Sequence, residues 1–77
     1  ITTMAFAELG ARVIKVENPH TGGDATRGWK LPGEPPESDL SGYFTCANWG
    51  KESLACDFTV PAGRAVVHDL ARRADIV

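Results

Sequence analysis

The stretch VIKVENPHTGGDATRGW, residues 13–29, decides the fold, because a strand pattern passes directly into a polar loop. Val13, Ile14 and Val16 are β-branched and apolar, a composition typical of a strand covered by helices on its faces. Proline, glycine and charged residues follow at once. Two interpretations are open: the loop is a solvated connector, or its position at the carboxyl end of a strand makes it part of a site.

The segments next to this strand have different patterns. Upstream, residues 2–9 place Met4 and Phe6 on one helical face, and Gly10 follows where a helix commonly ends. Downstream, residues 18–40 hold all but one of the five prolines and much of the glycine. That composition predicts a long irregular loop, and a loop of this length in a small domain is usually functional or a linker.

Three elements are expected in the second half of the chain. SGYFTCANWG predicts a short helix capped by Ser41, and residues 52–58 alternate in the manner of a strand. Residues 60–74 predict a helix with Pro61 at its first position. Its apolar stripe is expected to comprise Val66, Val67, Leu70, Ala71 and Ala74. Residues 75–77 are expected to begin a third strand.

This order of elements predicts the fold class. Helices alternating with strands are typical of α/β proteins, and the pattern predicts a fragment of a doubly wound, Rossmann-like parallel sheet. We expect both ends to continue in a longer chain. In such sheets ligands lie beyond the carboxyl ends of the strands. Two loops are therefore candidates for a site, residues 18–40 and residues 57–60.

Composition excludes several function classes. The chain has 77 residues and a net charge of −2, which argues against the basic surface of a nucleic-acid-binding protein. It has no apolar run long enough to span a bilayer. Cys46 and Cys56 are expected to be reduced, partly buried thiols in a cytoplasmic protein. His20 and His68 are isolated, so no metal site is expected.

The run TGGDATRG lies in the first candidate loop. Gly22 and Gly23 allow close backbone approach, and Asp24 and Arg27 stand beside them. The alternative is a glycine-rich turn with a weak Asp24–Arg27 surface ion pair. Neither the phosphate-loop pattern nor the Gly-x-Gly-x-x-Gly dinucleotide pattern occurs.

The second candidate loop leads into a helix. The unpaired amides of a helix start can bind an anion or a polar group. Alternatively, this is an ordinary strand-to-helix connection in which Asp57 or Thr59 caps the helix. The residues alone leave both interpretations open.

Two long segments resemble the N-terminal part of the class III CoA-transferase family. They are ELGARVIKVENPHTGGDATRGW and YFTCANWGKESLACDFTVPAGRAVVHDLARRADIV, which cover nearly the whole chain in the order that the family shows. The family includes formyl-CoA transferase, carnitine-type CoA transferases and α-methylacyl-CoA racemases. The resemblance implies that residues 1–77 are a partial N-terminal CoA-binding α/β domain of a longer enzyme.

The resemblance also implies a reaction. Family transferases move CoA from an acyl-CoA to a carboxylic acid through acyl–aspartyl anhydride and aspartyl-CoA thioester intermediates, and they form interlocked homodimers. The nucleophilic aspartate lies downstream of Val77 in the family, so no residue here is expected to be catalytic. CoA enters as a substrate, and no prosthetic group is expected. The alternatives are an acyl-CoA racemase of the same superfamily and a non-enzymatic CoA-binding module.

The resemblance assigns CoA contacts to particular residues. They are Asn18, Cys56, Asp57, Phe58 and Thr59. Relatives often have Arg at position 18, where it contacts the CoA nucleotide, whereas Asn18 can hydrogen-bond but supplies no charge. Arg27 and Lys51 match basic positions of the family and could serve either CoA or the structure. Val60 replaces the usual Thr before a helix, which should weaken the cap by about 1 kcal/mol.

Overall fold

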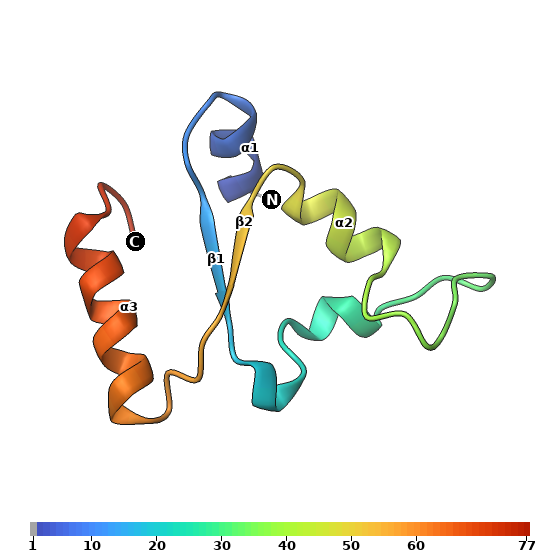
Figure 1. Cartoon of the computed structure of the whole chain (residues 1–77). Coiled ribbons are helices and arrows are strands. Elements are labelled where there is room, and N and C mark those ends of the chain that lie inside the picture. Colours follow the sequence, from blue (N-terminus) through green and yellow to red (C-terminus); the bar gives the residue numbers. More distant parts are fainter. Residues whose placement is uncertain (1) are drawn as a thin grey trace.

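A computed structural model describes residues 2–77, and Ile1 lies outside the described residues. The helices and strands alternate along the chain. In chain order they are α1 (Thr2–Glu8), β1 (Ile14–Glu17), the 3₁₀ turns η1 (Pro19–Thr21) and η2 (Ala25–Gly28), α2 (Gly42–Asn48), β2 (Glu52–Ala55) and α3 (Pro61–Arg73). The strands lie side by side in the middle, with α3 on one side and α1 and α2 on the other (Figure 1).

The two strands pair in parallel. Ile14 lies opposite Glu52 and Glu17 lies opposite Ala55, so the pairing extends along both strands. The Cys56 amide donates to the Glu17 carbonyl at 2.8 Å, one residue beyond the end of β2. Parallel pairing places both carboxyl ends at the same edge, and the crossover between the strands contains α2. The expected α/β class is therefore confirmed for the described part of the chain.

Two expectations about strands are wrong. Residues 75–77 form no strand, because within residues 2–77 they make no ladder with β1 or β2. β2 ends at Ala55 rather than continuing to Phe58. The reason is local: Asp57 accepts a hydrogen bond from the Thr59 amide at 2.9 Å, a side-chain turn that competes with a strand ladder.

The ends of the first two helices follow the sequence pattern. The chain leaves α1 through Gly10, whose φ of 97° lies in the left-handed region. Ser41 caps α2, because its Oγ accepts from the Phe44 amide at 3.0 Å. The same hydroxyl donates to the Thr26 carbonyl at 2.6 Å, and Ser41 is only 2 % exposed. Ser41 therefore also joins α2 to the loop after β1.

The start of α3 is confirmed as weakly capped. Val60 is the N-cap residue and makes no side-chain capping bond, and Pro61 occupies the first turn. The interpretation that Asp57 or Thr59 caps this helix is wrong, because the two residues hydrogen-bond to each other. The stripe of α3 is only partly covered: its first residue, Val66, is 45 % exposed.

Two charged side chains order the loop between η2 and α2. The Lys30 ammonium donates to the carbonyls of Pro35 and Ser38. The Glu34 carboxylate accepts from the amides of Leu31 and Gly42, and these bonds lower its pKa. The long loop is thus confirmed, but two 3₁₀ turns and these contacts give it more structure than expected.

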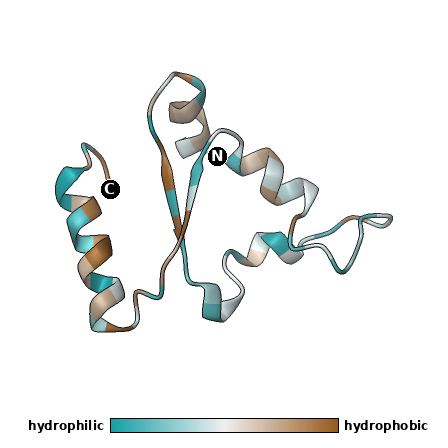
Figure 2. Ribbon diagram, viewed as in Figure 1, coloured by the Kyte–Doolittle hydropathy of each residue, from teal (hydrophilic) through white to brown (hydrophobic). Residues whose placement is uncertain are grey.

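The interior is small. Phe44 is the one buried apolar side chain among residues 2–77, and the accessible surface is 5794 Å². A compact monomer of this mass would expose about 4,500 Å². Phe6, on the apolar face of α1, is 40 % exposed. The ribbon of α3 alternates between hydrophobic and hydrophilic residues (Figure 2). No helix among the described residues has the length and apolarity needed to cross a membrane.

Replacing Ser41 with Ala should weaken the start of α2. The change removes both the cap and the bond to Thr26, so we expect a loss of about 1–2 kcal/mol and faster exchange of the Phe44 amide. Hydrogen exchange on the protein expressed from its complete reading frame measures this. Thr45→Ala, an exposed change in the same helix, is the matched control. Equal protection in both variants would contradict the dual role of Ser41.

Candidate functional site

An open hollow of about 190 Å³ lies at the carboxyl end of β1, beside the end of β2. Its lining includes Lys15, Glu17, Asn18, Thr21, Asp24 and Phe58. They come from β1, from the loop that follows it and from the turn after β2. The hollow thus lies where the sheet rule predicts a ligand, between the two candidate loops.

Asn18 joins the two candidate loops. Asn18 is only 7 % exposed. Its Oδ1 accepts a hydrogen bond from the His20 amide at 2.9 Å, and this bond caps η1. Its Nδ2 donates to Asp57 Oδ1 at 3.2 Å. Its carbonyl also accepts from the Gly23 amide at 3.0 Å. With both ends of its side chain occupied, Asn18 holds the site together as much as it lines it.

Asp57 receives several hydrogen bonds. The Thr59 hydroxyl and amide both donate to Oδ1, and Asn18 donates to the same oxygen. His20 Nε2 lies 3.8 Å from Oδ2. The Thr59 hydroxyl, then the Thr59 amide, lower the pKa of the Asp57 carboxyl, with smaller effects from His20 and Asn18. Asp57 is therefore a stable anion beside the hollow at neutral pH.

The other residues expected to contact CoA have different positions. Phe58 lines the hollow and is 43 % exposed, so its ring is available to a ligand. Thr59 lies beside the site through its bonds to Asp57. The Cys56 thiol faces the other way, toward the Gly63 carbonyl at 3.5 Å. Asn18, Asp57 and Phe58 are thus brought together, whereas the Cys56 side chain is not.

Gly63 is a site residue that sequence reasoning missed. It is the buried residue of α3, and a Cβ built on it would lie 1.7 Å from the Asp57 carbonyl oxygen. No side chain fits there, so glycine sets how closely α3 approaches the turn after β2. The Pro-x-Gly order at the start of the helix was the available signal, because glycine is unfavourable inside a helix unless packing requires it.

Arg27 anchors the loop to β1. Its Nη2 lies 2.9 Å and its Nε 3.1 Å from Glu17 Oε2, and the guanidinium lies 3.9 Å from the centre of the Phe44 ring. Both charged side chains are largely buried. Gly23 passes so close that a Cβ there would lie 2.7 Å from Glu17 Oε2. Gly23 therefore serves close approach, as one of the two interpretations proposed, whereas a Cβ on Gly22 would meet nothing within 4 Å and Gly22 ends η1 with a left-handed φ of 81°.

The expected Asp24–Arg27 ion pair is wrong. Asp24 Oδ2 lies 2.8 Å from Lys15 Nζ, and Asp24 Oδ1 accepts from the Thr26 amide at 2.9 Å. The Lys15 ammonium, then the Thr26 amide, lower the pKa of Asp24 to about 2. The loop folds back onto β1, so the two charged loop residues each pair with a strand residue of opposite charge: Asp24 with Lys15 and Arg27 with Glu17.

Lys51 has a structural contact. Its ammonium donates to Asn48 Oδ1 at 2.8 Å, at the end of α2. Burial, and then the charge of Lys15, lower its pKa. Arg27 and Lys51, whose roles the sequence left open, therefore both contact protein groups in this structure.

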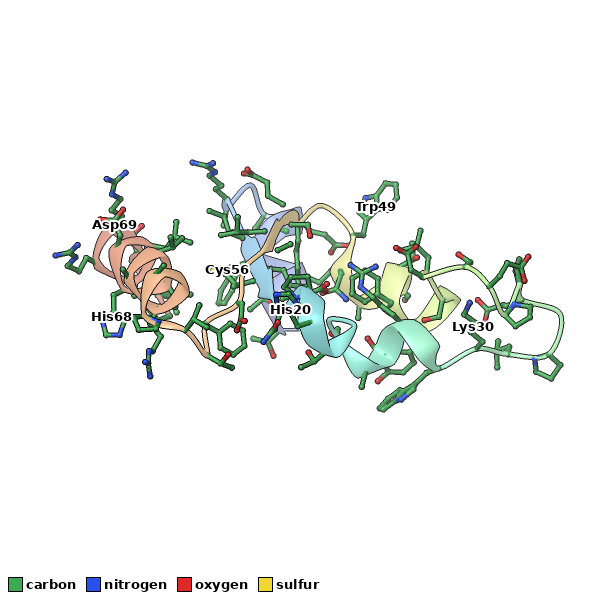
Figure 3. All side chains as sticks on the ribbon, turned by 60° about the horizontal axis from the view of Figure 1, so that its bottom comes forward. His20, Lys30, Trp49, Cys56, His68 and Asp69 are labelled. Carbon is green, nitrogen blue, oxygen red and sulfur yellow. The ribbon has the colours of Figure 1, made fainter. Side chains whose placement is uncertain are left out.

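The thiols fit only part of the expectation. Cys46 and Cys56 are both free, but Cys46 is exposed rather than partly buried. Within residues 2–77, no group of three His, Cys, Asp or Glu side chains could hold a metal ion. His20 and Cys56 lie near the strand ends, and His68 lies apart from them on α3 (Figure 3). The contacts observed around the hollow include hydrogen bonds and ion pairs.

Comparison with known proteins identifies the family. The model of CoA-transferase family III matches residues 1–77, and the chain belongs to this family. Succinate–glutarate CoA-transferase of Agrobacterium fabrum is 45 % identical over 75 residues, which cover 94 % of this chain and 18 % of that protein. Formyl-CoA:oxalate CoA-transferase of Rhodopseudomonas palustris is 43 % identical over 75 residues, covering 97 % of this chain and 17 % of that protein.

A mammalian protein shows the same similarity. Succinyl-CoA:glutarate CoA-transferase of Mus musculus is 42 % identical over 74 residues, which cover 96 % of this chain and 16 % of that protein. The chain thus spans less than a fifth of the length of each relative. No solved structure gives a significant match to the chain. The resemblance to class III CoA-transferases is confirmed.

Asp24→Asn should change how stability depends on pH. Because the folded pKa of Asp24 is about 2, below its ordinary value of 3.8, the Lys15–Asp24 contribution is present above pH 4 and is lost as pH falls toward 2. We expect the variant to be less stable by at most about 1 kcal/mol at pH 7, since the pair is partly exposed. The difference should shrink in urea unfolding between about pH 5 and pH 3.

Asn at position 24 keeps an oxygen for the Thr26 amide, so the comparison isolates the charge. Lys15→Met should remove the same pH-dependent component. The double variant should lose no more of the pH-dependent part of the free energy of unfolding than either single variant loses. A stability difference that is constant at every pH would contradict the assigned pair.

Gly63→Ala should destabilise the protein, although alanine usually favours a helix by about 1 kcal/mol. The added Cβ meets the Asp57 carbonyl, so we expect a net loss of about 1–3 kcal/mol in free energy of unfolding. Gly28→Ala is the matched control, because a Cβ there meets nothing within 4 Å. If Gly63→Ala were as stable as the wild type, the close approach of α3 would not be required.

Proposed function

We propose that the protein carrying this chain is a CoA-transferase that moves CoA between an acyl-CoA and a carboxylic acid. The observation that carries the proposal is the match of residues 1–77 to CoA-transferase family III. We propose further that this chain contributes part of the CoA site, at the hollow by the carboxyl ends of β1 and β2. The position of Asn18, Asp57 and Phe58 around that hollow supports this.

The family chemistry needs no net change in electrons or protons. An aspartate carboxylate attacks the thioester carbonyl of the donor and the C–S bond breaks, so that CoA leaves as a thiolate and an acyl–aspartyl mixed anhydride is formed. The thiolate attacks the aspartyl carbonyl of that anhydride, which gives an aspartyl-CoA thioester and releases the donor carboxylate. The acceptor carboxylate then attacks the aspartyl-CoA thioester, which releases the CoA thiolate and forms a second mixed anhydride. The thiolate attacks the acceptor acyl carbonyl of that anhydride, which gives the new acyl-CoA and frees the aspartate. We assign the nucleophile to a residue outside residues 1–77.

The residues of this chain would act by binding and orientation. Asn18 and Thr59 fix the turn after β2 through Asp57, and Gly63 sets the distance of α3 from that turn. Arg27 holds the loop after β1 through Glu17. We propose that these contacts give CoA a preformed surface, and that Phe58 is the side chain most available to it.

The names of the relatives favour transfer over racemisation. The Agrobacterium, Mus and Rhodopseudomonas proteins all carry transferase names. We also propose that the two strands belong to a doubly wound, Rossmann-like sheet and that the whole enzyme is an interlocked homodimer. A cytoplasmic location remains a prediction from the two free cysteines. The racemase and the non-enzymatic binding module are separated from transfer by the following experiment.

The protein expressed from its complete reading frame is incubated with succinyl-CoA and glutarate, the pair suggested by two relatives. We expect glutaryl-CoA to form and mass spectrometry to detect CoA covalently attached to the protein. Formyl-CoA with oxalate is the second pair, suggested by the Rhodopseudomonas protein. Deuterium exchange at the α-carbon of an acyl-CoA without transfer would support the racemase. CoA binding without either reaction would support the module.

A further inference from the structure

The sheet face on the side of α2 carries two lysines. Lys15 lies opposite Ser53 in the parallel pairing, and Lys51 precedes Ser53 by two residues, so the alternation of side chains places all three on one face. α2 lies on this side of the strands (Figure 1), and the Lys15 ammonium is 5.8 Å from the centre of the Phe44 ring on that helix. The two amino groups therefore share a partly covered surface.

Lys51 has a neutral partner on this surface. Its Nζ donates to Asn48 Oδ1 at 2.8 Å, and the Asn48 amide is held in turn by its bond to the Phe44 carbonyl at 2.9 Å. Burial, and then the positive charge of Lys15, lower the pKa of Lys51, although Asp24 acts in the opposite direction. Partial burial and a neighbouring like charge both favour the neutral amine, which is the nucleophilic form of lysine.

The other two lysines of the chain donate to stronger or more numerous acceptors. Lys15 forms an ion pair with Asp24 at 2.8 Å, and a bond to a carboxylate is stronger than one to a neutral amide. Lys30 donates to the carbonyls of Pro35 and Ser38 in the loop before α2. In these contacts lysine acts as an ammonium donor, which has no lone pair for nucleophilic attack.

We propose that Lys51 is a site of acylation by acyl-CoA thioesters and that it reacts before Lys15 and Lys30. The neutral amine attacks the thioester carbonyl, the C–S bond breaks, and CoA leaves as a thiolate that takes up the proton lost by the nitrogen. The products are an Nε-acyl-lysine and free CoA, with no oxidation or reduction. The acyl donor belongs to the substrate class of the proposed function, but the reaction needs no CoA site in this chain.

The product fits the position that Lys51 occupies. An acylated lysine keeps one N–H group, so its nitrogen can still donate to Asn48 Oδ1. Acylation removes the positive charge beside Lys15, and with it the cost of holding that charge in a half-buried position. Because Lys51 is also partly exposed, the acyl group can extend into solvent. The modified side chain is therefore compatible with the same contact at the end of α2.

The test is competitive acetylation of the protein expressed from its complete reading frame. The folded protein is incubated with acetyl-CoA near neutral pH, and mass spectrometry of digests gives the initial rate of acetylation at each of the three lysines. We expect Lys51 to react at least about threefold faster than Lys15 or Lys30. In guanidinium chloride the three rates should agree within about twofold, because unfolding removes both the burial and the fixed neighbours.

Two variants favour the protonated form of Lys51 in different ways. Asn48→Asp places a carboxylate at the position of the 2.8 Å contact, and Lys15→Met removes the neighbouring positive charge. Both should slow acetylation of Lys51 by at least about threefold, with the rate at Lys30 as internal reference. His68→Asp adds a carboxylate at an exposed residue of α3, on the other side of the strands (Figure 1), and should leave the rate unchanged.

The outcomes separate this inference from the proposed function. Equal rates at the three lysines of the folded protein would overturn the inference, and so would a preference for Lys51 that persists in guanidinium chloride. An unchanged rate at Lys51 in both folded variants would also overturn it. Selective acetylation of Lys51 that depends on the fold, and that slows in Asn48→Asp and Lys15→Met, supports the inference whether or not the protein transfers CoA to a carboxylic acid.

Discussion

Parallel pairing of β1 with β2 is the interaction on which the candidate site depends. It places the ends of both strands at one edge, where Asn18 reaches Asp57 across 39 positions of sequence. The Cys56 amide extends this pairing by donating to the Glu17 carbonyl, so the backbone continues together into the two loops. The bond between Asn18 and Asp57 follows from this arrangement, whereas the ion pairs of Lys15 and Glu17 join the loop after β1 to its own strand.

Polar contacts, more than apolar packing, order the loops. Phe44 is the one buried apolar side chain in the described chain, and its ring lies beneath the Arg27 guanidinium. A buried ion pair contributes little net stability, because desolvation offsets much of the attraction. Its geometry, however, fixes one loop conformation on β1. The arrangement therefore favours a defined loop over a strongly stabilised one, which suits the proposed role of this loop in a CoA site.

Local features were predictable from the sequence, and features that need distant partners were not. Ser41 as a cap and Gly10 after α1 depend on neighbouring residues, and both are found as expected. The ion partner of Asp24 was predicted wrongly, because nearness in sequence pointed to Arg27, whereas the folded loop brings Lys15 closer. The prediction of a third strand was wrong for the same reason. Residues 75–77 have the composition of a strand, but a strand also needs a neighbouring strand to pair with, and among residues 2–77 they pair with neither β1 nor β2. The steric demand at Gly63 is visible only when α3 is in place.

The long separation between the paired strands has a kinetic consequence. Closing a loop of 39 positions costs about 3 kcal/mol of chain entropy by its logarithmic length dependence, before any contact between the strand ends compensates. Helices such as α3 form from neighbours within about a microsecond, whereas this parallel pairing must wait for a diffusive search. We therefore expect the ligand-facing edge to be the last part of the chain to assemble and the first to open, so that bound ligand would slow its opening.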